Sequence, residues 1–161
     1  MRKPSISIVL GSQSDLEQVK PCLDICEEFK VSYELKILSA HRNPKKLVSY
    51  VQGASAGGTK IFIAAAGGAA ALPGVIAAHT SLPVIGVPIE TRSLKGLDSL
   101  LSIVQMPGGV PVACMAIGKS GAKNAGIFVL EVLALSDKKL ANKLRVYKKN
   151  LAKKIRKSKA R

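Results

Sequence analysis

The segment SAHRNP, residues 39–44, places His41 beside Arg42 directly after a predicted strand. The residues before it, 33–38, alternate polar and apolar side chains, which is typical of a half-buried strand. The Asn-Pro pair at 43–44 predicts a helix start, because asparagine caps helices and proline is favoured in their first turn. We therefore expect His41 and Arg42 in a strand-to-helix loop, where open α/β sheets bind their ligands.

These two side chains are suited to different parts of a reaction on an anionic substrate. Histidine ordinarily titrates near neutral pH, so His41 could both donate and accept a proton. The guanidinium of Arg42 presents a planar fork that matches a phosphate or a carboxylate. The structural alternative is that Arg42 pairs with a surface acid while His41 only packs. Their position in a strand-end loop favours the functional interpretation.

A second loop, GSQSD at residues 11–15, follows the first predicted strand. Gly11 allows a sharp turn, and Ser12 and Ser14 offer hydroxyls near the N-terminus of the next helix, where a phosphate or carboxylate is favoured. Asp15 could accept hydrogen bonds from sugar hydroxyls. The same residue types also serve as ordinary helix caps, so this motif alone does not decide between binding and structure.

A third loop follows the strand pattern KIFIAAAGG at residues 60–68 and ends in the glycine pair Gly67 and Gly68. These glycines could let a planar ring approach the backbone closely, or they could simply form a tight turn. The carboxyl ends of parallel strands meet at one edge of a sheet. The three loops, with Ser39 at the start of the second, are therefore predicted to form a single binding site.

Strand and helix patterns alternate along the chain with short connections, which predicts a parallel, doubly wound α/β sheet in one domain. GASAGGT at 53–59 is predicted to be a turn, and GVPVACMAI at 109–117 a fifth strand. The last helix of the body is apolar on nearly all sides over residues 127–135, which indicates burial against another subunit as well as the sheet.

Composition excludes several classes of protein. The 161 residues suit one domain, and the three cysteines lack further Cys or His at ligand spacing, so reduced structural thiols are expected and no metal site. No apolar run is long enough for a membrane span, and the N-terminal residues show no cleavable signal pattern. We therefore expect a cytoplasmic protein that does not enter a membrane.

The net charge of +15 belongs mainly to the C-terminal segment. Residues 138–161 contain 12 of the 25 Lys and Arg residues and none of the 10 acids, so the remaining residues have 13 bases against 10 acids and a net charge of +3. We expect two parts, a catalytic body over 1–136 and a basic appendage over 137–161. An amphipathic helix is predicted there from apolar residues spaced three or four apart: Leu140, Leu144, Tyr147, Leu151 and Ile155.

Two roles are open for this basic helix. It could be a solvated helix that docks on the body, or it could bind nucleic acid or another anionic surface. The segment has one aromatic residue and no recognised nucleic-acid motif, which argues against sequence-specific recognition.

Several segments in register resemble one family. GSQSD, SAHRNP, AGGAAALPG, LPVIGVP, GLDSLLSIVQMPGGVPV and AIGKSGAKNAG occur in the order found in the N5-carboxyaminoimidazole ribonucleotide mutases of purine biosynthesis, within the AIR carboxylase family. The resemblance extends from about residue 6 to 135. It implies a flavodoxin-like three-layer fold, an octameric assembly with sites between subunits, and no cofactor. It also implies an isomerase that moves a carboxylate from the exocyclic nitrogen of the substrate to C4 of the imidazole ring.

The resemblance also assigns roles to residues. His41 matches the catalytic histidine, Ser12, Asp15 and Arg42 match the residues that bind the ribonucleotide, and Ser14 and Ser39 are expected to help at the phosphate. A proton must reach the exocyclic nitrogen when CO₂ is lost and must leave C4 when CO₂ is recaptured. One acid/base that titrates near neutrality could serve both steps.

One position departs from the family pattern. The mutases usually have AGGAAHLPGM, whereas this chain has AGGAAALPGV, with Ala71 in the place of a histidine. Water or a neighbouring subunit could compensate, or the substitution could lower activity or change the substrate. Direct carboxylation of aminoimidazole ribonucleotide by CO₂, and ribonucleotide binding without catalysis, are therefore the alternatives to the mutase.

Overall fold

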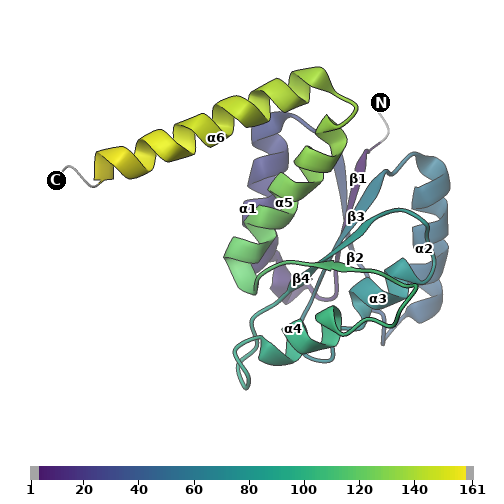
Figure 1. Ribbon diagram of the computed structural model, residues 1–161. Helices are drawn as coiled ribbons and strands as arrows, with labels where there is room; N and C mark the ends of the chain where they lie inside the picture. Colours follow the sequence, from purple (N-terminus) through teal and green to yellow (C-terminus); the bar gives the residue numbers. More distant parts are fainter. Residues whose placement is uncertain (1–3, 159–161) are drawn as a thin grey trace.

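Five parallel strands form one sheet in the order β2-β1-β3-β4-β5 in the computed structural model, which describes the backbone of residues 4–158 and the side chains of residues 4–153 (Figure 1). The strands are β1 (Ile6–Leu10), β2 (Tyr33–Ile37), β3 (Ile61–Ala66), β4 (Val84–Pro88) and β5 (Ala113–Cys114). This is the flavodoxin-like doubly wound order, in which ligands bind where the order reverses beside β1. The predicted fold class is confirmed.

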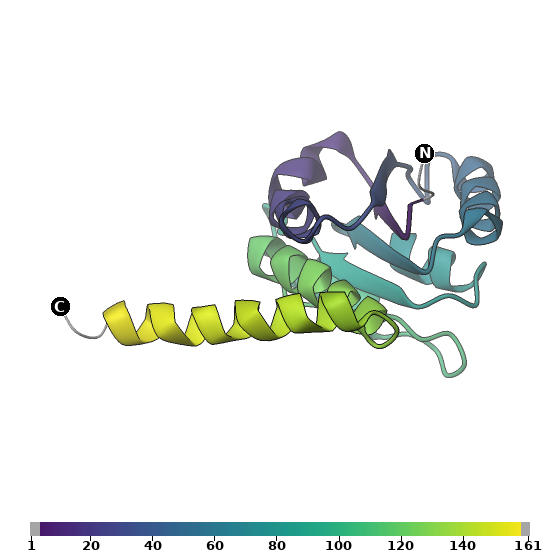
Figure 2. The same cartoon turned by 90° about the horizontal axis from the view of Figure 1, so that it is seen from above.

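Helices cover both faces of the sheet (Figures 1 and 2). On one face, α1 (Leu16–Phe29) and α5 (Gly118–Ala134) pack over a core that includes side chains from β1, β3 and β4. On the other face lie α2 (Pro44–Gly57), α3 (Leu72–Ala77) and α4 (Leu97–Val104). A short 3₁₀ turn, η1 (Gln13–Asp15), precedes α1, and the C-terminal helix α6 (Lys138–Ser158) packs outside α1 and α5.

Burial along the strands explains their composition. Every residue of β1, β3 and β4 is buried, because these central strands have helices on both sides, and their sequences are correspondingly continuous runs of mainly apolar residues. The edge strand β2 is only half-buried and keeps the alternating pattern YELKI. The loops after the central strands are therefore fixed to the most rigid part of the molecule.

Two elements differ from the sequence prediction. Residues 53–59 were predicted to form a turn, but α2 continues to Gly57 and ends at Gly58, whose φ is +110°. Apolar contacts of Val51 and Ala54 with the core on this face offset the poor helix propensity of the glycines. The fifth strand is also shorter than predicted, because Pro111 in its first half has no backbone N–H to donate to a ladder.

The three cysteines are free thiols, with Cys22 and Cys26 buried in the core. In the part of the chain that the structure describes, no helix has the length and apolar character needed to cross a membrane.

The turn into α5 requires a glycine, and this requirement can be tested. A Cβ on Gly121 would lie 1.6 Å from the carbonyl oxygen of Ala116, so the backbone would have to move. We expect Gly121→Ala to lower the free energy of unfolding by about 3 kcal/mol, measured by urea denaturation.

The control is another helical glycine-to-alanine change. Gly53 lies inside α2 and a Cβ there meets nothing within 4 Å. Gly53→Ala should therefore raise the free energy of unfolding by about 0.5–1 kcal/mol through helix propensity. Equal effects of the two substitutions would contradict this account of α5.

Candidate functional site

The loops that follow β1, β2, β3 and β4 surround one cavity of about 870 Å³ at the carboxyl edge of the sheet. The position is the one expected for a ligand site in an open α/β sheet. Of the residues singled out from the sequence, all but one line this cavity: Ser12, Ser14, Asp15, Ser39, His41, Arg42 and Gly67.

The β1 loop is closed by a capping box. The backbone N–H of Ser12 donates to Asp15 Oδ2 at 3.0 Å, and the Ser12 Oγ accepts from the backbone N–H of Ser14 at 3.4 Å. The Ser14 hydroxyl donates to Ser12 Oγ at 2.9 Å. The serine hydroxyls and the carboxylate thus lie together at the entry to α1, where the helix dipole favours an anion beside them.

Asp15 is the most buried ionisable group of the cavity, with 7% of the residue exposed. Burial raises the pKa of its carboxyl, and hydrogen bonds from Ser12 and Ser14 and the nearby charge of Arg42 only partly oppose that shift. The folded protein therefore bears a free-energy cost for the ionised form of Asp15. A buried carboxyl whose pKa is shifted in this way is more typical of a functional site than of a stabilising contact.

The β2 loop is joined to the β1 loop through Arg42. Its guanidinium Nη2 donates to the carbonyl oxygen of Gly11 at 3.3 Å, while its backbone N–H donates to Ser39 Oγ at 3.2 Å. Asn43 caps α2 by accepting from the backbone N–H of Lys46 at 3.2 Å, as the sequence predicted. These contacts hold Arg42 across two loops and place the exposed His41 at the wall of the cavity.

The two glycines of the β3 loop are separated by the structure. Gly67 lines the cavity, and a Cβ on it would contact Ile89 and Thr91 at 3.5–3.6 Å. Gly68, with φ +68°, is outside the cavity lining; its N–H donates to Ser99 Oγ at 3.0 Å, and its carbonyl accepts from the Ser102 hydroxyl at 3.2 Å. Gly68 thus fixes the loop to α4.

The loop after β4 was not singled out from the sequence, although it forms a whole side of the cavity. Its lining residues are Ile89, Glu90, Thr91 and Arg92. Rules about strand ends in parallel sheets could have identified this loop, because it follows the fourth strand as the other three follow theirs. It lacks the histidine, serine and glycine pattern that drew attention to them.

Side chains from distant segments hold this fourth loop. The amide of Gln18 on α1 accepts from the backbone N–H of Glu90 at 2.9 Å and donates to its carbonyl at 3.3 Å. The Thr91 hydroxyl donates to the carboxylate of Asp98 at 2.8 Å, and the buried Ser99 hydroxyl donates to the Ile89 carbonyl at 2.7 Å. Arg92, by contrast, forms no ion pair with any residue whose side chain the structure describes.

The arrangement offers anion binding, polar contacts and proton transfer in one space. Two guanidiniums, three serine hydroxyls and a helix N-terminus suit a phosphate or carboxylate, and Asp15 suits hydroxyl groups. His41 is the only imidazole among the residues that line the cavity, and Ala66, Ala70 and Ala71 form an apolar wall. Among the residues described, no cluster of His, Cys, Asp and Glu could hold a metal ion.

Comparison with known proteins identifies the family of the chain. The family model for AIR carboxylase matches residues 5–154. The chain is 54% identical over 142 residues to the N5-carboxyaminoimidazole ribonucleotide mutase of Bacillus subtilis, covering 88% of both chains, and 49% identical over 148 residues to that of Pyrococcus abyssi, covering 92% of this chain and 84% of the relative.

Solved structures give the same assignment. A crystal structure of Treponema denticola PurE superposes with a TM-score of 0.88 at 27% identity, covering 98% of this chain and 97% of that chain. A crystal structure of a PurE2 variant from the same organism gives a TM-score of 0.89 at 26% identity, with 99% and 98% covered. With its strand order, its cavity at the carboxyl edge and these matches over most of its length, the chain belongs to the AIR carboxylase family.

Proposed function

We propose that this chain is an isomerase that converts N5-carboxyaminoimidazole ribonucleotide to 4-carboxy-5-aminoimidazole ribonucleotide in purine biosynthesis. The observation that supports it most is the convergence of four strand-end loops on one cavity, in a chain about half identical to relatives named for this reaction. The substrate has a phosphate, a ribose, a planar ring and a carboxylate, and the cavity has a group suited to each.

The phosphate and ribose fit the side of the cavity made by the β1 and β2 loops. Ser12, Ser14 and Ser39 supply hydroxyls, and Arg42 supplies a guanidinium already held by Gly11 and Ser39. Asp15 accepts hydrogen bonds from ribose hydroxyls. Gly67 lines the cavity without a side chain, so the imidazole ring can lie close to the β3 loop there, and Gly68, with φ +68°, forms the turn that follows.

His41 then acts as the acid and base. In the first step the bond between the exocyclic nitrogen and the carboxyl carbon breaks, CO₂ forms, and the imidazolium of His41 donates a proton to that nitrogen. In the second step C4 of the ring forms a bond to CO₂, and the neutral imidazole removes the proton from C4. One proton leaves the histidine and one returns, so the enzyme is unchanged after each turnover.

The CO₂ must stay beside the ring between these steps. Ala66 and Ala70 are buried and apolar and form part of the cavity wall, so they offer CO₂ a surface without polar competitors. Holding the two reactants in one cavity replaces a bimolecular encounter by an intramolecular one.

Arg92 compensates in this proposal for the missing histidine at position 71. Ala71 and Arg92 line the same cavity, and Arg92 has no ion pair with a described residue. The substrate has two anionic groups and the cavity has two arginines, so Arg42 can bind the phosphate while Arg92 donates to the migrating carboxylate. Direct carboxylation of aminoimidazole ribonucleotide is the second candidate, because Ala71 lines the cavity at the position where the mutases usually have a histidine.

The catalytic unit spans residues 1–136 and works in the cytoplasm as a homo-octamer in which neighbouring subunits border the site. Support for an assembly comes from apolar side chains that the chain leaves exposed, notably Leu135 and Phe128 at α5 and Leu97 and Leu101 on α4. Light scattering on the purified protein would measure the number of subunits.

An assay with both substrates tests the function. Purified protein should convert the carboxyamino ribonucleotide to its 4-carboxy isomer without added ATP or metal, followed by ultraviolet absorbance. Carboxylation of aminoimidazole ribonucleotide with bicarbonate, in the absence of isomerisation, would show the second candidate instead. Nucleotide binding without either reaction would refute both.

Replacing the proposed acid/base should stop turnover. We expect His41→Asn to lower kcat by a factor of about 10² to 10⁴, because asparagine cannot exchange a proton, while substrate binding by calorimetry changes little. His79→Asn is the matched control, since His79 lies outside the cavity and its ring is hydrogen-bonded to the Val75 carbonyl. If both variants retain full activity, His41 is not the proton carrier.

If Arg92 compensates for the histidine missing at position 71, substitutions at these two positions should have non-additive effects on activity. Arg92→Ala should lower kcat/KM about 10- to 100-fold, the range for a lost hydrogen bond to a charged group. Ala71→His should change the native enzyme less than threefold yet recover part of the activity in the Arg92→Ala background. Strict additivity in this double-mutant cycle would contradict the compensation.

Asp15 should show opposite effects on binding and stability. Asp15→Asn should weaken ribonucleotide binding at least tenfold, but the free energy of unfolding at pH 7 should not fall, because the substitution removes a carboxylate whose ionised form the fold disfavours. Protonation of the carboxyl removes this penalty from the folded wild type. The difference in free energy of unfolding between Asp15→Asn and the wild type should therefore shrink as the pH falls toward 4. A variant less stable than wild type at pH 7 would contradict the account of Asp15.

A further inference from the structure

The C-terminal helix α6 has a surface that the proposed reaction does not use. The helix contains 21 residues, so it is about 31 Å long at 1.5 Å per residue. It starts at a cap in which Asp137 Oδ1 accepts from the backbone N–H groups of Lys139 and Leu140 at 2.9 and 3.0 Å. Figures 1 and 2 show that its far half extends beyond the sheet and the other helices.

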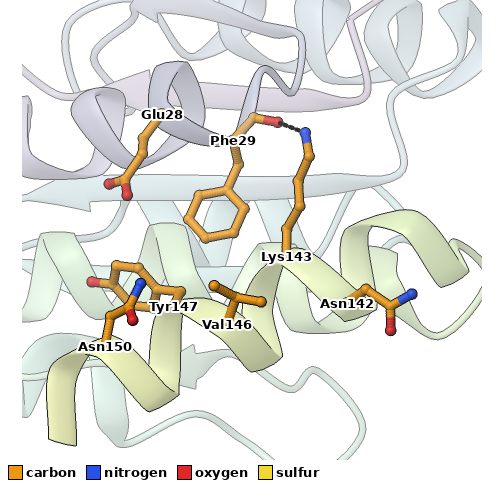
Figure 3. Close-up of a pocket in the computed structure, with 7 residues that line it drawn as sticks. All are labelled: Glu28, Phe29, Asn142, Lys143, Val146, Tyr147 and Asn150. Carbon is orange, nitrogen blue, oxygen red and sulfur yellow. Dashed lines mark hydrogen bonds between the residues drawn. The ribbon is translucent and has the colours of Figure 1, made fainter. Parts of the chain in front are cut away.

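The near half of α6 is firmly docked on the body. Leu140 and Leu144 are buried against a small core that contains Phe29. The rings of Phe29 and Tyr147 meet edge to face with centroids 5.5 Å apart, and Lys143 Nζ donates to the Phe29 carbonyl at 3.3 Å, as Figure 3 shows. These contacts fix the direction of the helix, so its far half is presented in one orientation.

The far half is exposed and basic. Each residue from 148 to 153 is exposed, and α6 contains no acidic residue. Lys148 pairs with Glu131 on α5. The other basic residues of α6 with described side chains have no ion pair to a described residue: Lys138, Lys139, Lys143, Arg145, Lys149 and Lys153.

A membrane surface or a second copy of the chain fits this helix poorly. The large apolar residues exposed on it, Val146 at 57% and Leu151 at 39%, lie five residues apart and therefore about 140° apart around the axis, so they form no common face for insertion into lipid. A second copy would bring another basic helix, and the chain before residue 138 has a net charge of +3, which offers no acidic excess.

We propose that α6 binds the phosphate backbone of double-stranded nucleic acid through its exposed basic residues, which include Arg145, Lys149 and Lys153. A duplex has about one negative charge per 1.7 Å of its axis, a uniform and extended array that a straight basic helix can follow. Contacts of this kind use charge rather than base edges and need no recognition motif. The binding is therefore independent of nucleotide sequence and decreases steeply with salt.

Fluorescence anisotropy of the full chain with a labelled random 30-base-pair DNA duplex tests this proposal. We expect binding at 50 mM NaCl, with a slope of log K against log salt concentration of about −3 or steeper, which corresponds to three or more phosphate contacts. The double variant Arg145→Glu/Lys149→Glu should bind at least tenfold more weakly and reduce the magnitude of the slope by about 2.

The control is a second double variant that makes the same change in net charge at another part of the surface. Lys60 and Lys123 are exposed residues of the body outside the cavity, so Lys60→Glu/Lys123→Glu should retain the duplex affinity within threefold. Isomerase activity should be unchanged in both double variants, which separates this proposal from the proposed reaction.

Four results would overturn the proposal. These are absence of duplex binding at 50 mM NaCl, equal loss of affinity in the two double variants, and binding to phosphatidylglycerol vesicles that excess duplex does not displace. The fourth is a change of oligomeric state, measured by light scattering, in the α6 variant alone, which would show that a second copy covers the helix.

Discussion

All strands of the sheet run in the same direction, and this constraint determines where chemistry can occur. Loops after β1, β2, β3 and β4 are forced to one edge, so residues 80 positions apart in the chain, such as Ser12 and Arg92, line the same cavity. The central strands are fully buried between two layers of helices. The site is therefore built on the part of the fold that can move least.

Hydrogen bonds from side chains to the backbone transmit that rigidity into the loops. Arg42 ties the second loop to the first, Ser99 ties the end of β4 and the third loop to α4, and Gln18 ties the fourth loop to α1. The proposed mechanism needs this organisation, because a proton and a CO₂ molecule must be exchanged within a single cavity. Burial disfavours the ionised form of Asp15, and a cost in stability of this kind is common at functional sites.

Much of this could be predicted from the sequence, for physical reasons. Period-two and continuous apolar runs indicated the strands, and turn and capping chemistry indicated the Asn43 cap and the residues of the first two loops. The fourth loop follows a strand as the other three do, but it lacks the histidine, serine and glycine pattern that marked them. Its anchoring by Gln18, across 72 residues of chain, is a tertiary contact that no local pattern shows. The end of α2 was wrongly predicted because tertiary packing outweighed glycine propensity. Where the exposed half of α6 points also depends on a tertiary contact, between Phe29 and Tyr147.

The central claim is that one ribonucleotide spans the cavity with its phosphate beside Arg42 and its imidazole beside His41. The most direct measurement is a crystal structure of the protein with 4-carboxy-5-aminoimidazole ribonucleotide bound. The account predicts an imidazole nitrogen of His41 within about 3.5 Å of the exocyclic nitrogen or C4 of the ligand, with the phosphate against the Ser12 loop. A ligand bound outside this cavity, or one whose ring lies beyond the reach of His41, would contradict it.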